Sequence, residues 1–243
     1  LHLGDGIRVD TAPVNTCVEL RQFIEHYTEK RHDNLPWRLI INGDMVDFIG
    51  ICLMPEEAGL ISDLHPDDHY YGLSNRPHAA ALKMTHVLSH HADIFRAMAR
   101  FIGHGNEVII VVGNHDAAFH FVEVQQALRE ALQEFWAQED EAHQIDAISG
   151  DELGRALTFC PWFYFEEGVA WIEHGHQYDP YCSFDSVLDP ATDERDLDPN
   201  IDSAILHYVA NHSMPMRSNS WGKGFFWYLQ WSFNQGFSRL LTI

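Results

Sequence analysis

The order of apolar and polar residues along the chain predicts helices that alternate with short buried strands. Residues 15–31 and 77–103 have apolar side chains at helical spacing, and the second segment has a proline near its start and a glycine near its end. Residues 37–41 and 107–112 are short apolar runs that stop at polar, glycine-containing clusters, as expected for buried strands. Residues 50–75 hold prolines, acids and histidines without a clear period, which predicts an irregular insertion.

The second half of the chain continues this alternation. Residues 121–138 predict a further helix, and residues 156–165 and 168–173 predict two strands joined as a hairpin. Residues 180–200 are acidic, whereas residues 203–243 are rich in aromatic side chains and are predicted to be helical. The alternation of strands and helices predicts an α/β fold with a largely buried sheet.

Composition and charge narrow the classes of partner and compartment. The 243 residues include 36 Asp and Glu but only 15 Lys and Arg, a formal net charge of -21 that disfavours a dedicated nucleic-acid binder. No apolar run approaches the roughly 18 residues of a transmembrane helix, so we expect no membrane-spanning segment. The 4 cysteines are scattered and form no C-x-x-C pair, so a reducing cytoplasm is the simplest compartment.

Three predicted strands end in clusters of residues that can bind metal ions. The clusters are residues 43–47 (GDMVD), 113–116 (GNHD) and 174–176 (HGH), in a chain with 17 histidines. Each cluster alone also fits a structural turn or a helix cap. Because sites in open α/β sheets form at the carboxyl ends of strands, the three clusters can converge on one crevice. Asp, Asn and His ligands together favour Mn, Fe, Zn or Co over a thiolate-type site.

These clusters resemble the motifs of the calcineurin-like metallophosphoesterase family. Residues 43–47 match its G-D-x-x-D motif, residues 113–116 match G-N-H-[DE], and His174 is similar to its isolated histidine. The first residues resemble the end of S-D-L-H-L-G, which makes His2 the histidine of the D-x-H motif. The resemblance implies a four-layer α/β/β/α sandwich over residues 1–180, followed by a helical, aromatic-rich insertion or cap over residues 181–243.

The resemblance also implies the chemistry of the family. This is hydrolysis of a small phosphomonoester, phosphodiester or pyrophosphate-linked substrate by a metal-bridging hydroxide, with two divalent transition-metal ions as cofactors. His2 would bind the first metal ion, and Asp44 would bridge both ions. Asn114 and His174 would bind the second.

Two further residues take catalytic roles by the same resemblance. His115 would protonate the leaving oxygen or stabilise the phosphoryl charge, and Asp47 would orient His115. A competing interpretation makes His115 itself a metal ligand. A residue outside the family pattern, His176, could pair with His174 as a degenerate H-x-H metal site. The run S-D-L-H at residues 62–65 imitates a motif, but no apolar strand precedes it.

The chain lacks two parts of the family pattern. The aspartate expected before Leu1 is missing, and no G-H-x-H follows His176. We therefore expect the natural protein to be longer at both ends.

Two interpretations remain open alongside the enzymatic one. Residues 221–237 could cap the site or contact a membrane surface, although we favour packing of these aromatic side chains in a core. The chain could also be a non-catalytic binding or scaffolding module that retains the fold, which a measurement of metal content would distinguish.

Overall fold

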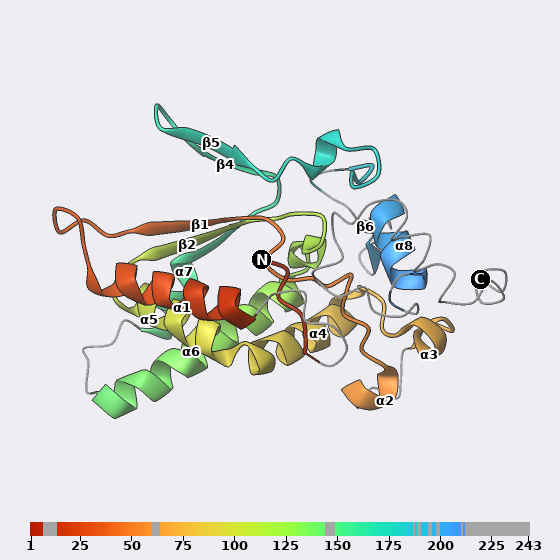
Figure 1. Ribbon diagram of the computed structural model, residues 1–243, viewed down its shortest axis with the longest axis horizontal. Helices are drawn as coiled ribbons and strands as arrows, with labels where there is room; N and C mark the ends of the chain where they lie inside the picture. Colours follow the sequence, from red (N-terminus) through yellow and green to blue (C-terminus); the bar gives the residue numbers. More distant parts are fainter. Residues whose placement is uncertain are drawn as a thin grey trace.

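A three-stranded parallel sheet in the order β1-β2-β3 lies at the centre of the computed structural model (Figure 1). The strands are β1 (Arg38–Asn42), β2 (Glu107–Val111) and β3 (Leu157–Cys160). The structure describes residues 1–6, 14–59, 64–143, 149–186, 188, 191–193, 196–197, 200–209 and 211. Within this part of the chain, the mixed α/β class expected from the sequence is confirmed.

The register of the sheet places the ends of β1 and β2 side by side. Arg38 pairs with Glu107 and Asn42 pairs with Val111, so the two parallel strands start and stop together. β2 is the central strand, and its last four residues are buried, as expected for a Val- and Ile-rich run covered on both faces. The loops that follow β1 and β2 therefore begin at the same edge of the sheet.

One face of the sheet is covered by helices that were mostly predicted from the pattern. They are α1 (Val14–Glu29), α4 (Pro77–His90), α5 (Ala92–Gly103), α6 (Val122–His143) and α7 (Gly150–Arg155). Figure 1 shows α1, α5 and α6 layered beneath the strands. Helix α5 packs against α1, α6 and β2, and α4 packs against α6. The core lies between these helices and β2.

The single helix predicted for residues 77–103 is in fact two helices that meet at His91. The His91 N–H donates to the Val87 carbonyl and so ends α4, while the His91 carbonyl accepts from Ile94 and starts α5. Asp93 lies in the first turn of α5, where the positive end of the helix dipole stabilises a carboxylate. The apolar period continues through the break, so periodicity alone could not reveal it.

The prediction of one strand over residues 156–165 was also wrong. Pro161 follows β3 and has no N–H to donate, and the chain bends there before the antiparallel hairpin of β4 (Phe163–Glu166) and β5 (Ala170–Glu173). Arg38 of β1 donates to the Tyr164 hydroxyl, and the Asn42 amide donates to the Glu173 carbonyl. The first contact holds the hairpin beside the start of β1, and the second holds the end of β5 near the end of β1.

Short elements complete the described chain. The expected irregular insertion over residues 50–75 contains two one-turn helices, α2 (Pro55–Ala58) and α3 (Asp68–Tyr71). Beyond the hairpin, the expected helical region starts at α8 (Ile201–Tyr208). The remaining elements are η1 (Ala117–His120), η2 (His176–Tyr178), β6 (Ala191–Asp193) and β7 (Asp196–Leu197).

Some predictions concern residues that the structure does not describe. The aromatic segment 221–237 lies outside the described residues, as do the first two positions of the S-D-L-H run. Among the described helices, none combines the length and apolar character needed to cross a lipid bilayer.

A fully buried lysine ties α4 to the loop after β1. The Lys83 ammonium donates to the Phe48 carbonyl at 3.0 Å and to Asn75 Oδ1 at 2.8 Å. Burial lowers the pKa of Lys83 to about 8, although nearby acidic groups, including Cys52 and Asp47, act in the opposite direction. The lysine therefore supports the loop from inside the core, and its charge makes this support costly.

We expect Lys83→Met to lower the free energy of unfolding at pH 7 by about 1–3 kcal/mol, because buried acceptors lose their donor. Between pH 8 and 10.5 the unfolded wild-type chain binds the lysine proton more tightly than the folded chain does. Wild-type stability should therefore rise by roughly 3 kcal/mol relative to the variant across this window. Urea unfolding at pH 7 and pH 11 measures both effects, and a constant difference between the two proteins would contradict the assigned pKa.

Candidate metal centre

The carboxylate of Asp116 joins the loops that follow β1 and β2. Its Oδ1 accepts the N–H of Gly113 at 2.6 Å, and its Oδ2 accepts the N–H of Met45 at 2.7 Å. Asp116 is completely buried. Burial and the nearby charge of Asp44 raise its pKa to about 6, although the two backbone donors favour the charged form. Asp116 is the last residue of the GNHD motif, and no role was predicted for it from the sequence. In the structure it sets the spacing of the two loops.

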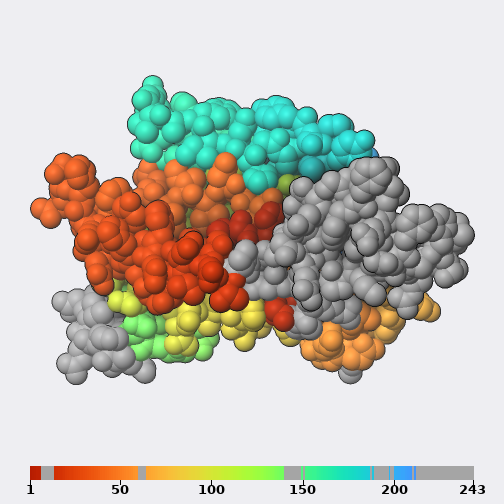
Figure 2. Space-filling view, in the orientation of Figure 1, coloured from red at the N-terminus to blue at the C-terminus, as the bar shows by residue number. Residues whose placement is uncertain are grey.

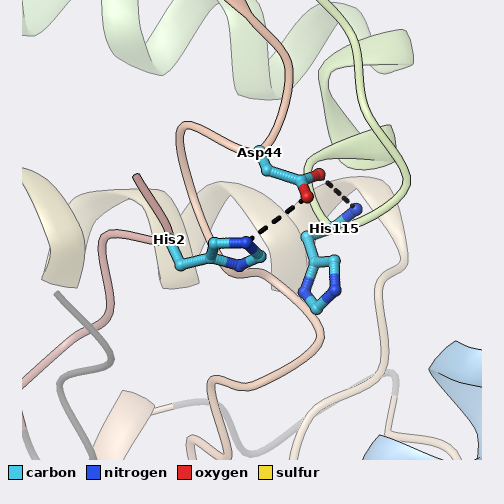
Figure 3. A group of neighbouring side chains, drawn as sticks. All are labelled: His2, Asp44 and His115. Carbon is cyan, nitrogen blue, oxygen red and sulfur yellow. Dashed lines mark hydrogen bonds and ion pairs between the residues drawn. The ribbon is translucent and has the colours of Figure 1, made fainter. Parts of the chain in front are cut away.

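Asp44 lies at the centre of the site and has three polar neighbours, of which Figure 3 shows His2 and His115. Its Oδ1 accepts the backbone N–H of His115 at 3.1 Å. Its Oδ2 lies 3.4 Å from His2 Nε2 and 3.2 Å from His174 Nε2. Burial alone would raise the pKa of Asp44, but His174 and His115 outweigh it and lower the pKa to about 2. Asp44 is therefore a carboxylate with an imidazole on each side.

Two glycines allow this close packing. A Cβ atom on Gly43 would overlap the ring of His174, and one on Gly113 would overlap the Asp44 carboxylate. Gly43 also has φ +74, a left-handed conformation that other residues rarely adopt. Asp44 itself has φ 53, so the turn that aims its side chain holds a strained backbone of the kind found at functional sites.

His2 reaches Asp44 through backbone pairing between the first residues and the loop after β1. The His2 N–H donates to the Asp44 carbonyl, and the Leu3 N–H donates to the Met45 carbonyl. Its ring is partly exposed and makes an edge contact with the ring of His115, with the centroids 4.5 Å apart. Burial and the neighbouring His115 lower the pKa of His2. Figure 2 shows the first residues, in dark red, recessed beneath the cyan region that follows β3.

His174 enters the site from the hairpin, directly after β5. Its Nδ1 lies 2.9 Å from the Asn42 carbonyl, which can only accept, so this nitrogen carries a proton. Its Nε2 then faces Asp44 with a lone pair when the ring is neutral, which places two acceptors against each other. A proton or a metal cation between them resolves this repulsion, and an imidazole fixed by a backbone carbonyl is the usual arrangement of a metal-binding histidine.

His115 has a carboxylate on each side of its ring. Nδ1 lies 2.8 Å from Asp47 Oδ1, and Nε2 lies 3.5 Å from Asp202 Oδ2. Asp47 is buried, and its Oδ1 also accepts the Gly50 N–H. Burial lowers the pKa of His115, but Asp202 and Asp47 outweigh it and raise the pKa to about 10. Asp47 therefore contacts His115, as predicted.

Asp202 is a site residue that the sequence did not reveal. It lies in the first turn of α8, and its Oδ2 accepts from the amide of Asn114 at 3.3 Å in addition to facing His115. The side-chain nitrogen of Asn114 is used in this bond, which leaves its carbonyl oxygen as the group that could bind a metal ion. A single acid near the start of a helix carries no local signal of such a contact.

The structure brings most of the predicted ligands together. The ligand atoms of His2, Asp44 and His115 all lie within 4.8 Å of one another, and His174 joins them through Asp44. Buried Asn114 is connected to this group indirectly, because its amide donates to the Asp202 carboxylate, which also lies beside the ring of His115. These oxygen and nitrogen donors fit a divalent transition-metal ion.

His176 lies beside this group. It is buried, its ring centroid is 5.6 Å from that of His174, and its Nδ1 has no hydrogen-bond partner among the described residues. Burial and the adjacent His174 lower its pKa to about 4, so the ring is neutral at pH 7. Binding of metal by His176 stays a prediction.

Comparison with known proteins gives no relative from which to assign the site. No family model, no curated protein and no solved structure matches the chain. The geometry of the site is therefore the basis of any functional proposal.

We expect Asp44→Asn to reduce metal binding strongly, because this carboxylate is shared by both predicted ions. The loss should exceed the roughly 10–100-fold that removal of a ligand's hydrogen-bond partner costs. Metal titration and elemental analysis measure the effect. The exposed Asp93 of α5 provides a control, Asp93→Asn, which should bind metal as the wild type does. Asn114→Ala should disturb mainly one ion, and full metal occupancy in Asp44→Asn would refute the bridging role.

Proposed function

We propose that the protein is a metal-dependent phosphoester hydrolase that acts on a small phosphorylated substrate. The observation that supports this most is the position of Asp44, whose carboxylate contacts His2, His174 and the backbone of His115. This arrangement agrees with the metal ligands expected from the resemblance to metallophosphoesterases. In the same proposal, the sheet and the hairpin belong to the four-layer sandwich of that family.

The residues divide into metal ligands and groups that act on the substrate. His2 and Asp44 would hold one ion, and Asp44, Asn114 and His174 would hold a second. When bound, the two ions would supply positive charge against the phosphoryl group and lower the pKa of water. Mn, Fe, Zn and Co all suit this donor set.

His115 supplies the proton that the leaving group requires. The bond between Asp47 and Nδ1 fixes the ring and favours its charged form. Nε2 then carries a proton on the side that faces Asn114 and Asp202. In the proposed reaction, a water oxygen forms a bond to phosphorus, and the bond to the leaving oxygen breaks. The leaving oxygen keeps the electron pair and takes the proton from Nε2 of His115, while the water proton goes to solvent.

The alternative is a binding or scaffolding module that retains the fold without catalysis. The contact of His115 with Asp47 favours the enzyme, because a buried carboxylate that raises the pKa of an imidazole is typical of acid–base catalysis.

We expect His115→Asn to lower turnover by roughly 10²–10⁴-fold while metal content stays nearly unchanged. The loss should be largest for alkyl phosphoesters, whose leaving oxygen needs a proton, and smallest for nitrophenyl esters. Asp47→Asn should show a milder form of the same pattern, because it weakens only the orientation and charge of His115. Steady-state kinetics with both ester types, together with elemental analysis, measures this.

The exposed His78 of α4 provides the matched control, since His78→Asn should leave turnover of both ester types unchanged. If His115 is instead a metal ligand, the His115→Asn variant will lose metal, and its turnover will fall by the same factor for all esters. If wild-type protein binds metal but hydrolyses neither ester type, the scaffolding alternative is favoured.

A further inference from the structure

A cavity of about 130 Å³ opens beside His115 and Asn114. Its walls come from the loop after β2, from the segment around α3 and from α8, which Figure 1 shows at the same end of the molecule. This volume is several times that of one water molecule, so a small organic group fits. Because His115 lines the cavity, a substrate whose leaving oxygen meets this histidine would direct its leaving group into it.

Three polar groups in the wall can bind a polar organic molecule. The Ser74 hydroxyl is buried and has no hydrogen-bond partner among the described residues. Asn75 uses its oxygen to accept from Lys83, which leaves its NH₂ group as a donor. His65 Nδ1 accepts the backbone N–H of Asp67, so the neutral ring carries its proton on Nε2. A hydroxyl group can bond to all three, because it both donates and accepts, whereas an ammonium group can donate to the Ser74 hydroxyl.

The charge of the wall excludes one kind of ligand. Among the described residues that line the cavity there is no lysine or arginine, but there are two carboxylates. Asp68 is buried and accepts the N–H groups of His65 and Ser74, whereas the side chain of Asp67 is 45% exposed. A second phosphate or a carboxylate in the cavity would meet these charges, and the charged ring of His115 in the same wall already lies between Asp47 and Asp202.

We infer that this cavity receives the alcohol portion of the phosphoester, and that this alcohol is uncharged or positively charged. Small amino alcohols are the preferred class, because an ammonium group would be attracted by Asp67. The inference rests on the proposed function, since it uses His115 as the acid for the leaving oxygen. It extends that function by excluding substrates whose leaving group carries an anion.

Three phosphate esters of similar size test the charge preference. They are 2-aminoethyl, 2-hydroxyethyl and carboxymethyl phosphate, each offered as the monoester and as the methyl diester. We expect kcat/KM to fall in that order, by about three- to tenfold at each step, which is the effect of one partly solvated charge at close range. Equal values, or a preference for the carboxymethyl ester, would overturn the inference.

The variant Asp67→Asn tests whether Asp67 causes the charge preference of the cavity. It should reduce the ratio of kcat/KM between the aminoethyl and carboxymethyl esters by about three- to tenfold. The exposed Asp93 of α5 lies outside the cavity, so Asp93→Asn should leave this ratio unchanged. An unchanged ratio in Asp67→Asn, or an equal reduction in Asp93→Asn, would contradict the assignment.

A binding measurement separates this inference from the proposed function. Saturation-transfer NMR of the zinc-loaded wild-type protein and its Asp67→Asn variant ranks the same three esters without requiring turnover. The expected order of binding without any hydrolysis would refute the proposed hydrolase function and support the proposed charge preference of the cavity. Hydrolysis with equal binding of all three esters would support the proposed hydrolase function and refute the proposed charge preference of the cavity.

Discussion

The buried carboxylate of Asp116 holds the two loops of the site at a fixed spacing. It accepts one N–H from the loop after β1, at Met45, and one from the loop after β2, at Gly113. These donors adjoin Asp44 and Asn114, so the two hydrogen bonds determine where the predicted ligands lie. A buried acceptor left without a donor costs about 1–3 kcal/mol, and more when charged, so neither loop can shift alone. The contact of Asp44 with the backbone of His115 follows from this constraint.

Electrostatics explains why carboxylates and imidazoles gather at this edge of the sheet. Asp44, Asp47 and Asp202 each lie within 3.5 Å of a histidine nitrogen. A carboxylate and a neutral imidazole nitrogen attract only when a proton or another cation lies between them. The site therefore pairs each of these carboxylates with an imidazole, so that a proton or a metal cation can be held between them, in a chain whose formal net charge is -21.

The local parts of the fold and the site were predictable, and the parts that depend on distant contacts were not. The ends of β1 and β2 could be placed together because parallel neighbours in register stop at one edge, and their motifs lie there. The break at His91 depends on packing that the apolar pattern does not encode, whereas the departure of the chain at Pro161 follows from a local signal, a proline inside an otherwise apolar run. Asp202 contacts Asn114 across 88 positions of sequence, and nothing in its neighbours indicates this partner.

The same carboxylate of Asp202 connects the site to the wall of the cavity. Its Oδ2 meets both Asn114 and His115, and it belongs to the first turn of α8. Ser203, Ala204 and His207 of the same helix line the cavity. A second contact, between the rings of Tyr208 and Tyr71, joins α8 to α3, and Tyr208 also lines the cavity. The helix is thus anchored at one end by the contacts of Asp202 with Asn114 and His115 and at the other by an aromatic pair, so the shape of the cavity depends on a residue that also contacts His115.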